Sequence, residues 1–242
     1  MIRPMIRTVL CFMATLGVWL NPAPALAAAP TSEADIQAER LLWAVGSRPA
    51  WASLTNTVVY SQQYRRDDPT DVGAVIIIDY RQPRLRIDTT GRDLQLVRLI
   101  DSDGDRSWRL DRLGRPEKET EDPLAQDLRR YTAHVYWTLQ RIAVRDPKLR
   151  LDLDRKGRLE VYEGNARIAW YLLDARGEPY AMGAHDDNVG VICGPWEVEQ
   201  RGIRYPAWVS RPDGSWRATL KSLAVNVPMD EKLFTQPLVA EQ

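Results

Sequence analysis

Most of the chain alternates apolar and polar residues with a period of two, and this pattern constrains the fold more than any other feature. Between Thr57 and Val227 the alternating stretches are short, and turn pairs such as Lys156-Gly157 and Asp213-Gly214 separate them. Alternation gives each strand one apolar face, and tight turns join neighbouring strands antiparallel. The sequence therefore predicts a mainly β protein of the α+β class, with an antiparallel meander in a single domain over residues 28–242.

Two segments have a helical period instead. Ser32 or Thr31 can cap an N-terminal helix from Glu33 to about Val45, because both are good N-cap residues and acids follow. Its apolar stripe is expected to hold Ile36, Leu41, Leu42 and Val45. In residues 123–144, apolar residues recur at helical steps, at Leu124, Leu128, Tyr131, Val135, Leu139 and Ile142. We expect this inserted helix to cover the sheet as a lid.

Residues 1–27 have the features of a cleaved secretory signal peptide. Arg3 and Arg7 precede an apolar run from Val9 to Leu20, and Ala25-Leu26-Ala27 fits the small-x-small cleavage rule. The run is shorter than the ~20 residues that a spanning helix needs. We therefore expect a periplasmic protein without a transmembrane segment in its mature chain; an uncleaved N-terminal anchor is the alternative.

Charge and composition exclude several classes of function. The 33 Lys and Arg residues equal the 33 Asp and Glu residues, so the chain lacks the basic excess of a nucleic-acid binder. Two His and two Cys are too few for most His/Cys metal sites. The sequence has no phosphate loop, dinucleotide fingerprint or G-x-S-x-G nucleophile. Hence we predict no catalytic residue, no metal site and no cofactor.

The aromatic residues are unusual in kind. There are 9 Trp and 9 Tyr but 2 Phe, so most aromatic side chains pair a large apolar body with a polar tip. Such side chains suit walls that meet solvent or an amphiphilic ligand. Ordinary core packing is the alternative interpretation for any one of them.

Four stretches, in this order, carry a resemblance to a known family. They are the N-terminal helix followed by long strands, Gln82-Pro-Arg-Leu-Arg86, Asp103-Gly104-x-x-x-Trp108, and the ending from Val225 to Pro237. Together they resemble the LolA/LolB-like family of periplasmic and outer-membrane lipoprotein-sorting proteins. One position departs from the carriers, because Gln82 stands where they have a basic residue before the proline. The nearest base is Arg81, a candidate polar contact.

The resemblance implies an incomplete, strongly curved antiparallel β-barrel whose open side is plugged by helices and whose hollow holds acyl chains. We expect the hollow and its lid to be lined by Tyr60, Leu85, Ile87, Trp108, Leu128, Val135, Leu139 and Ile142. The expected function is a monomeric carrier of a hydrophobic or acylated ligand. The alternative is a sensing or interaction module that contacts another envelope protein.

Overall fold

The computed structural model describes residues 32–67, 72–91, 94–101, 108–110, 114–118, 134–198 and 201–234. Its helices are α1 (Glu33–Ala44), α2 (Arg48–Ala52), α4 (Val135–Ala143) and the 3-10 turn η1 (Glu231–Phe234). The N-terminal strands are β1 (Asn56–Arg65), β2 (Val72–Asp79), β3 (Arg84–Gly91), β4 (Leu94–Asp101), β5 (Trp108–Leu110) and β6 (Pro116–Lys118). The later strands are β7 (Leu149–Leu153), β8 (Leu159–Glu163), β9 (Ala166–Leu173), β10 (Pro179–Ala184), β11 (Val191–Cys193), β12 (Trp196–Val198), β13 (Arg204–Pro206), β14 (Trp208–Ser210) and β15 (Trp216–Val225).

Eleven of the described strands form one large antiparallel sheet, in the order β4-β3-β2-β1-β15-β14-β11-β10-β9-β8-β7. Strands β12 and β13 form a separate pair, as do β5 and β6. The sheet does not close into a barrel, since β4 and β7 lie at opposite ends of this order. The expected fold class, a curved antiparallel sheet with helices, is thereby confirmed.

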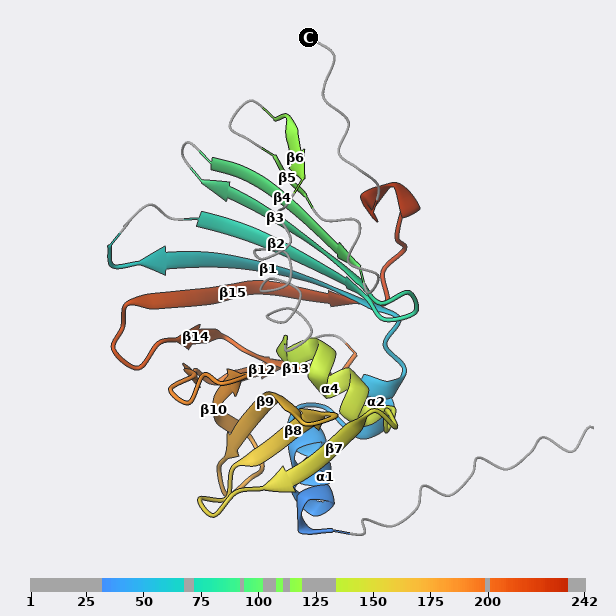
Figure 1. The fold of residues 1–242 in the computed structure, drawn as a ribbon, viewed down its shortest axis with the longest axis vertical. Helices are drawn as coiled ribbons and strands as arrows, with labels where there is room; N and C mark the ends of the chain where they lie inside the picture. The colour runs from blue at the N-terminus through green and yellow to red at the C-terminus, as the bar shows by residue number, and fades with distance from the viewer. Residues whose placement is uncertain are drawn as a thin grey trace, which may run out of the picture.

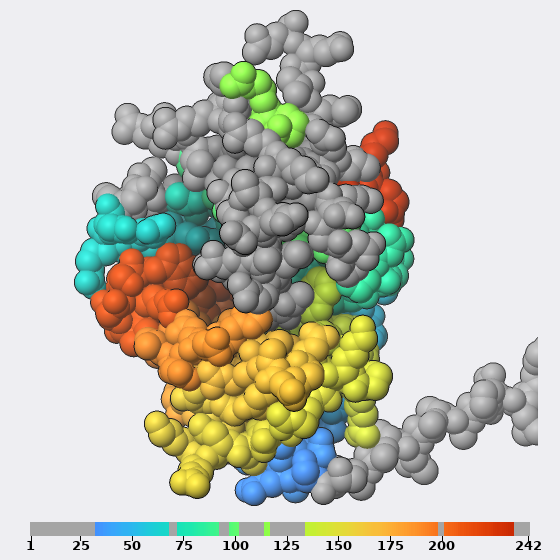
Figure 2. All heavy atoms as spheres, in the orientation of Figure 1, coloured from blue at the N-terminus to red at the C-terminus, as the bar shows by residue number. Residues whose placement is uncertain are grey.

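The sheet has two flanks that lie on opposite sides of α4. In Figure 1, strands β1 to β4 form one flank, strands β7 to β9 form the other, and α4 and α2 lie between them. In the space-filling view of Figure 2, the red-orange atoms of β15 lie beside the orange atoms of the strands that come between β15 and β9, and the yellow atoms of the second flank follow. This arrangement turns the inner faces of both flanks toward the helices.

Strand β15 joins the two flanks by pairing with β1. The register runs from Thr57 opposite Val225 to Arg65 opposite Trp216, with a bulge between Tyr60 and Ser61. At the start of this ladder, the side chain of Asn226 accepts a hydrogen bond from the Thr55 backbone N–H at 2.7 Å. The side chain of Asn56 in turn donates to the Val227 carbonyl at 2.9 Å and accepts from the Val227 N–H at 3.0 Å. The first and last long strands are therefore fastened by side chains as well as by the ladder.

Helix α1 begins where the sequence predicts. The Ser32 side chain accepts from the Asp35 N–H at 3.1 Å, and the Asp35 carboxylate accepts from the Ser32 N–H at 3.1 Å, a reciprocal capping box. Leu41, Leu42 and Val45 are fully buried as expected. Ile36 was wrongly placed on this stripe, since it is 49% exposed. At roughly 100° per residue, Ile36 lies about 140° around the helix from Leu41.

The inserted helix ends as predicted, and its first half lies outside the described residues. Helix α4 runs over Val135–Ala143 with Val144 as its C-cap; residues 123–133 are not among those described. Leu139 and Ile142 are buried, at 0% and 3% exposure, and belong to the main core cluster. The described part of this helix is therefore packed into the core on one face.

Charged groups attach α4 to its neighbours. The Arg141 guanidinium donates to Asp146 at 2.7 Å and to Glu163 on β8 at 2.8 Å. Arg48 of α2 donates to the Ile142 and Ala143 carbonyls, each at 2.6 Å, and pairs with Glu39 of α1 at 2.8 Å. The last carbonyls of a helix lack intrahelical partners, so Arg48 gives the Ala143 carbonyl a partner and adds one to the Ile142 carbonyl, which also accepts from the Arg145 N–H at 3.2 Å. These contacts connect α1, α2 and α4 to one another and connect α4 to β8.

Leu139→Ala should lower the free energy of unfolding by about 2–5 kcal/mol, because it empties a fully buried site in the core. The control is Val144→Ala on the same helix, where the side chain is 46% exposed and the change should stay within about 0.5 kcal/mol. Urea unfolding of both variants measures the difference. Equal stability of the two variants would contradict the placement of α4 in the core.

Candidate ligand-binding interior

The inner faces of both flanks and the three helices contribute to one apolar cluster. Residues from the first flank include Val59, Ile78, Leu85, Ile87 and Leu223, and residues from the second include Leu159, Val161, Ile168 and Tyr171. The helices add Leu41, Leu42, Trp51, Tyr136, Leu139 and Ile142. This interior is the candidate site for an apolar ligand, because it is where the curved sheet turns its apolar face.

Most of the predicted site residues whose side chains are described meet in this cluster. Leu85, Ile87, Leu139 and Ile142 belong to it, and Val135 packs against it. Leu128 and the side chain of Trp108 lie outside the described residues. The sequence prediction therefore grouped residues of β3 and α4 that do lie together in one interior.

Tyr60 does not join them, which corrects the expected facing of β1. Its side chain is 43% exposed, whereas Thr57, Val59 and Ser61 are buried at 4% or less. Successive residues of a strand face opposite sides, so Tyr60 lies on the outer face. There its ring passes over Gly73 of β2, within 3.8 Å of where a Cβ would stand. That spacing is ordinary van der Waals contact, so the ring packs on the outer face of β2.

Arg81 lies at the rim of the sheet, and Arg84 is the more enclosed base nearby. The Arg81 side chain is 60% exposed and its Nε lies 3.7 Å from Asp79. The Arg84 side chain is 10% exposed, donates to Asp79 at 2.9 Å and to Glu231 at 2.6 Å, and stacks over Phe234 at 4.1 Å. Burial opposes the charge of Arg84, but Glu231 and Asp79 raise its pKa overall. Arg84 therefore fastens η1 to β3.

Aromatic rings with polar tips line the part of the interior next to α4. Tyr136 stacks on Trp51 with ring centroids 6.0 Å apart, and Tyr80 meets Trp137 edge-on at 6.1 Å. The Trp51 indole N–H donates to the Val45 carbonyl at 3.0 Å. The Tyr80 hydroxyl shares a hydrogen bond of 3.0 Å with the Thr57 hydroxyl. The excess of Trp and Tyr over Phe in the sequence predicted aromatic walls with polar tips, but this composition could not identify which Trp and Tyr residues form them.

Three tyrosines and one cysteine of this interior are uncharged at neutral pH. Burial raises the pKa of Tyr80, Tyr136 and Tyr171 well above the ordinary value, so each phenol keeps its proton. Burial likewise raises the pKa of the Cys193 thiol to about 12, which makes it a poor nucleophile. These groups can donate hydrogen bonds to a ligand but cannot pair with a charge on it.

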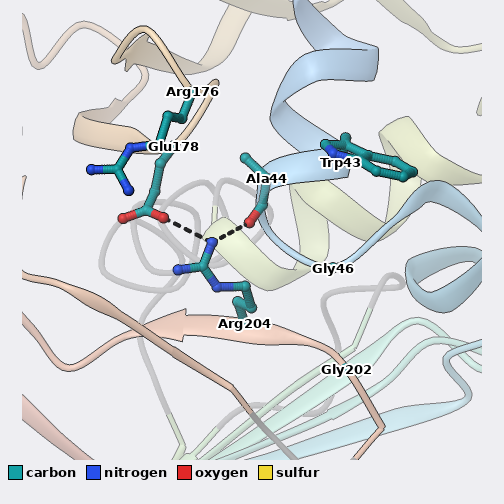
Figure 3. Close-up of a pocket in the computed structure, with 7 residues that line it drawn as sticks. All are labelled: Trp43, Ala44, Gly46, Arg176, Glu178, Gly202 and Arg204. Carbon is teal, nitrogen blue, oxygen red and sulfur yellow. Dashed lines mark hydrogen bonds and ion pairs between the residues drawn. The ribbon is translucent and has the colours of Figure 1, made fainter.

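A second concavity opens on the surface where α1 ends. Figure 3 shows this pocket of about 400 Å³, which is lined by Trp43, Ala44, Gly46, Arg176, Glu178, Gly202 and Arg204. The Arg204 guanidinium donates to the Glu178 carboxylate at 2.8 Å and to the Ala44 carbonyl at 2.6 Å. Gly46 has a φ of 139°, and a Cβ there would lie 2.7 Å from the Gly202 carbonyl oxygen. Trp43 is 80% exposed beside this polar pocket.

Within the described ranges, no three or more His, Cys, Asp or Glu side chains are grouped to hold a metal ion. Helices in that part of the chain are also too short or too polar to cross a membrane.

Comparison with known proteins adds little to this geometry. No family model matches the sequence, and no curated protein matches it. The chain resembles the solved structure of a DUF1329 family protein from Desulfovibrio piger, with 9% sequence identity and a TM-score of 0.32. The match covers 86% of this chain and 98% of that one. A TM-score this low supports no statement about the function of the protein.

His134, the N-cap of α4, should make the free energy of unfolding depend on pH. Its Nδ1 accepts from the Tyr136 N–H at 3.4 Å, and burial lowers its pKa to about 4. As the pH falls below ~6.5, the unfolded chain binds a proton that the folded protein binds only near pH 4. The free energy of unfolding should therefore decline between pH 6.5 and pH 4, by at most about 3 kcal/mol.

The comparison variant is His134→Asn, which keeps a cap acceptor and does not titrate. Its stability should decline less than that of the wild type over the same pH window, as followed by urea unfolding at several pH values. Identical pH profiles for the two proteins would show that His134 is not buried as the neutral imidazole.

Proposed function

We propose that the protein is a periplasmic carrier that holds a lipid, an acyl chain or a lipidated protein in the hollow of its open half-barrel. The observation that carries this proposal is the eleven-stranded sheet, which is unclosed and turns apolar inner faces toward three short helices. A sheet with one apolar face must cover it with other elements or with a ligand. The signal-like N-terminus supports the compartment.

The character of the inner face supports an apolar ligand. Ile76, Trp137 and Leu220 are partly buried and pack against the cluster, so each keeps surface that a ligand could cover. Burial of apolar surface contributes roughly 25 cal/mol per Å², which is the main source of affinity for an acyl chain. The order of motifs that resembles the LolA/LolB-like family is in keeping with such a ligand.

Ile76→Ala should weaken the binding of a fluorescent acyl-chain probe by roughly tenfold. The change removes apolar surface from the inner face of β2, worth about 1–2 kcal/mol if the ligand covers it. Titration of the probe into wild type and variant measures the two dissociation constants. Native mass spectrometry of the purified protein should in addition show a co-purified lipid.

The matched control is Ile77→Ala, the same chemical change at the neighbouring residue on the opposite face of β2. Ile77 is 6% exposed, so its loss should destabilise the protein at least as much as the loss of Ile76. Probe binding by the folded control should stay at the wild-type value. If both variants lose binding equally, or the wild type binds no acyl probe, the carrier proposal is wrong.

A second candidate function is a sensing or docking module for another envelope protein. The observation that favours it is Trp43, which is 80% exposed beside the surface pocket at the end of α1. An exposed Trp is a common anchor of protein interfaces, since it supplies a large contact area with few rotatable bonds. In this function the apolar interior is simply the core.

Under this second function, Trp43→Ala should abolish crosslinking to an envelope partner while leaving acyl-probe binding and thermal stability unchanged. The control is Val189→Ala, which removes another large exposed side chain, 65% accessible, and should keep the crosslink. Crosslinking in intact periplasm followed by gel analysis makes the comparison. Retention of the crosslink in the Trp43 variant would exclude the pocket as the docking site.

A further inference from the structure

The Tyr136 hydroxyl is a buried donor without an acceptor among the residues that the structure describes. Tyr136 is 1% exposed, and its oxygen has no hydrogen-bond partner there. Buried polar atoms nearly always have a partner, and one without it needs an explanation. The Tyr171 oxygen also lacks a bond of standard geometry there, but the Thr138 side chain is close enough to lower its pKa. Tyr136 is therefore the clearer case.

The ring of Tyr136 is held so that the hydroxyl cannot turn toward water. One face stacks on Trp51, which is itself fully buried and bonded through its indole N–H to the Val45 carbonyl. The ring also lies against His134, with centroids 5.3 Å apart. These contacts fix the direction of the side chain without satisfying its hydroxyl.

Titratable groups from both sides of β15 act on the Tyr136 hydroxyl. After burial, which raises the pKa of Tyr136 most, the charges that Tyr80, Tyr205 and Cys193 would carry if ionised raise it further. Tyr80 follows β2 of the first flank, whereas Cys193 ends β11 on the other side of β15. All three of these neighbours are hydroxyl or thiol groups, so they present donors and, among the described residues that act on Tyr136, none carries a positive charge.

We propose that Tyr136 donates a hydrogen bond to an uncharged acceptor of the bound ligand, of the kind found in the carbonyl of an acyl ester or amide. This inference rests on the carrier function and specifies its ligand class. A neutral carbonyl gains the missing bond and needs no counter-charge, whereas a carboxylate in these surroundings would be a buried charge without a cation. The ligand is then an acylated molecule and not a free fatty acid.

The test uses Tyr136→Phe in the full chain, with two pyrene probes of equal chain length. One probe is a methyl ester and the other is a plain alkane without a carbonyl. Loss of the hydrogen bond should weaken ester binding by about fivefold and leave alkane binding unchanged. The wild type should also bind the ester more tightly than the corresponding free acid.

The matched control is Tyr80→Phe, which removes the same atom from a hydroxyl that is already bonded to Thr57. Without ligand, Tyr136→Phe should leave the melting temperature unchanged or raise it, because it removes an unsatisfied group. Tyr80→Phe should lower it. If Tyr136→Phe lowers the melting temperature as much as Tyr80→Phe does, the hydroxyl has a partner within the protein and the inference is overturned.

The outcomes separate this inference from the function on which it rests. If the wild type binds both probes and the Tyr136→Phe variant binds each with the same affinity as the wild type, the carrier function is supported and the proposed role of Tyr136 is wrong. If the wild type binds neither probe, the carrier function falls and the inference falls with it. Equal weakening of ester and alkane binding would mark a packing effect and would also overturn the inference.

Discussion

The pairing of β1 with β15 is the interaction on which the rest of the structure depends. It joins Thr57 to Val225 across almost the whole described chain and lies in the middle of the sheet order. Without it, β1 to β4 would form one sheet, and β7 to β11 with β14 and β15 would form another. Such a non-local contact must overcome a large loop-closure entropy, so the ladder is reinforced at its start by the side chains of Asn56 and Asn226.

Once the flanks are joined, their apolar inner faces must be covered, and the helices cover them. Helix α4 places Leu139 and Ile142 in the core. Arg141, on the same helix, donates a hydrogen bond to Glu163 of β8. Arg48 completes the carbonyl ends of α4 and reaches Glu39 of α1. Charged groups thus fix the position of the helices around the core, and apolar groups fill it.

The part of the interior next to α4 holds uncharged titratable groups, although the chain is rich in charge. They are phenols, a thiol and an imidazole, and burial shifts the pKa of each toward the uncharged form. The guanidinium of Arg84 is held near the end of the sheet by Asp79 and Glu231. The uncharged donors beside α4 are the basis for proposing a ligand that is apolar with an uncharged acceptor.

Local interactions are what the sequence by itself determined. The period of two predicted the strands, and Ser32 or Thr31 followed by acids predicted the start of α1, because turns, alternation and caps involve residues close in the chain. The apolar step of α4 likewise predicted that Leu139 and Ile142 share a buried face. Tertiary structure decided which face of β1 points to the interior. Tyr60 packs over Gly73 of β2, and the register between these two strands cannot be deduced from the sequence of β1 alone. It also decided that the hydroxyl of Tyr136 is buried without a partner among the described residues, because its surroundings come from segments far apart in the chain, such as Trp51 of α2.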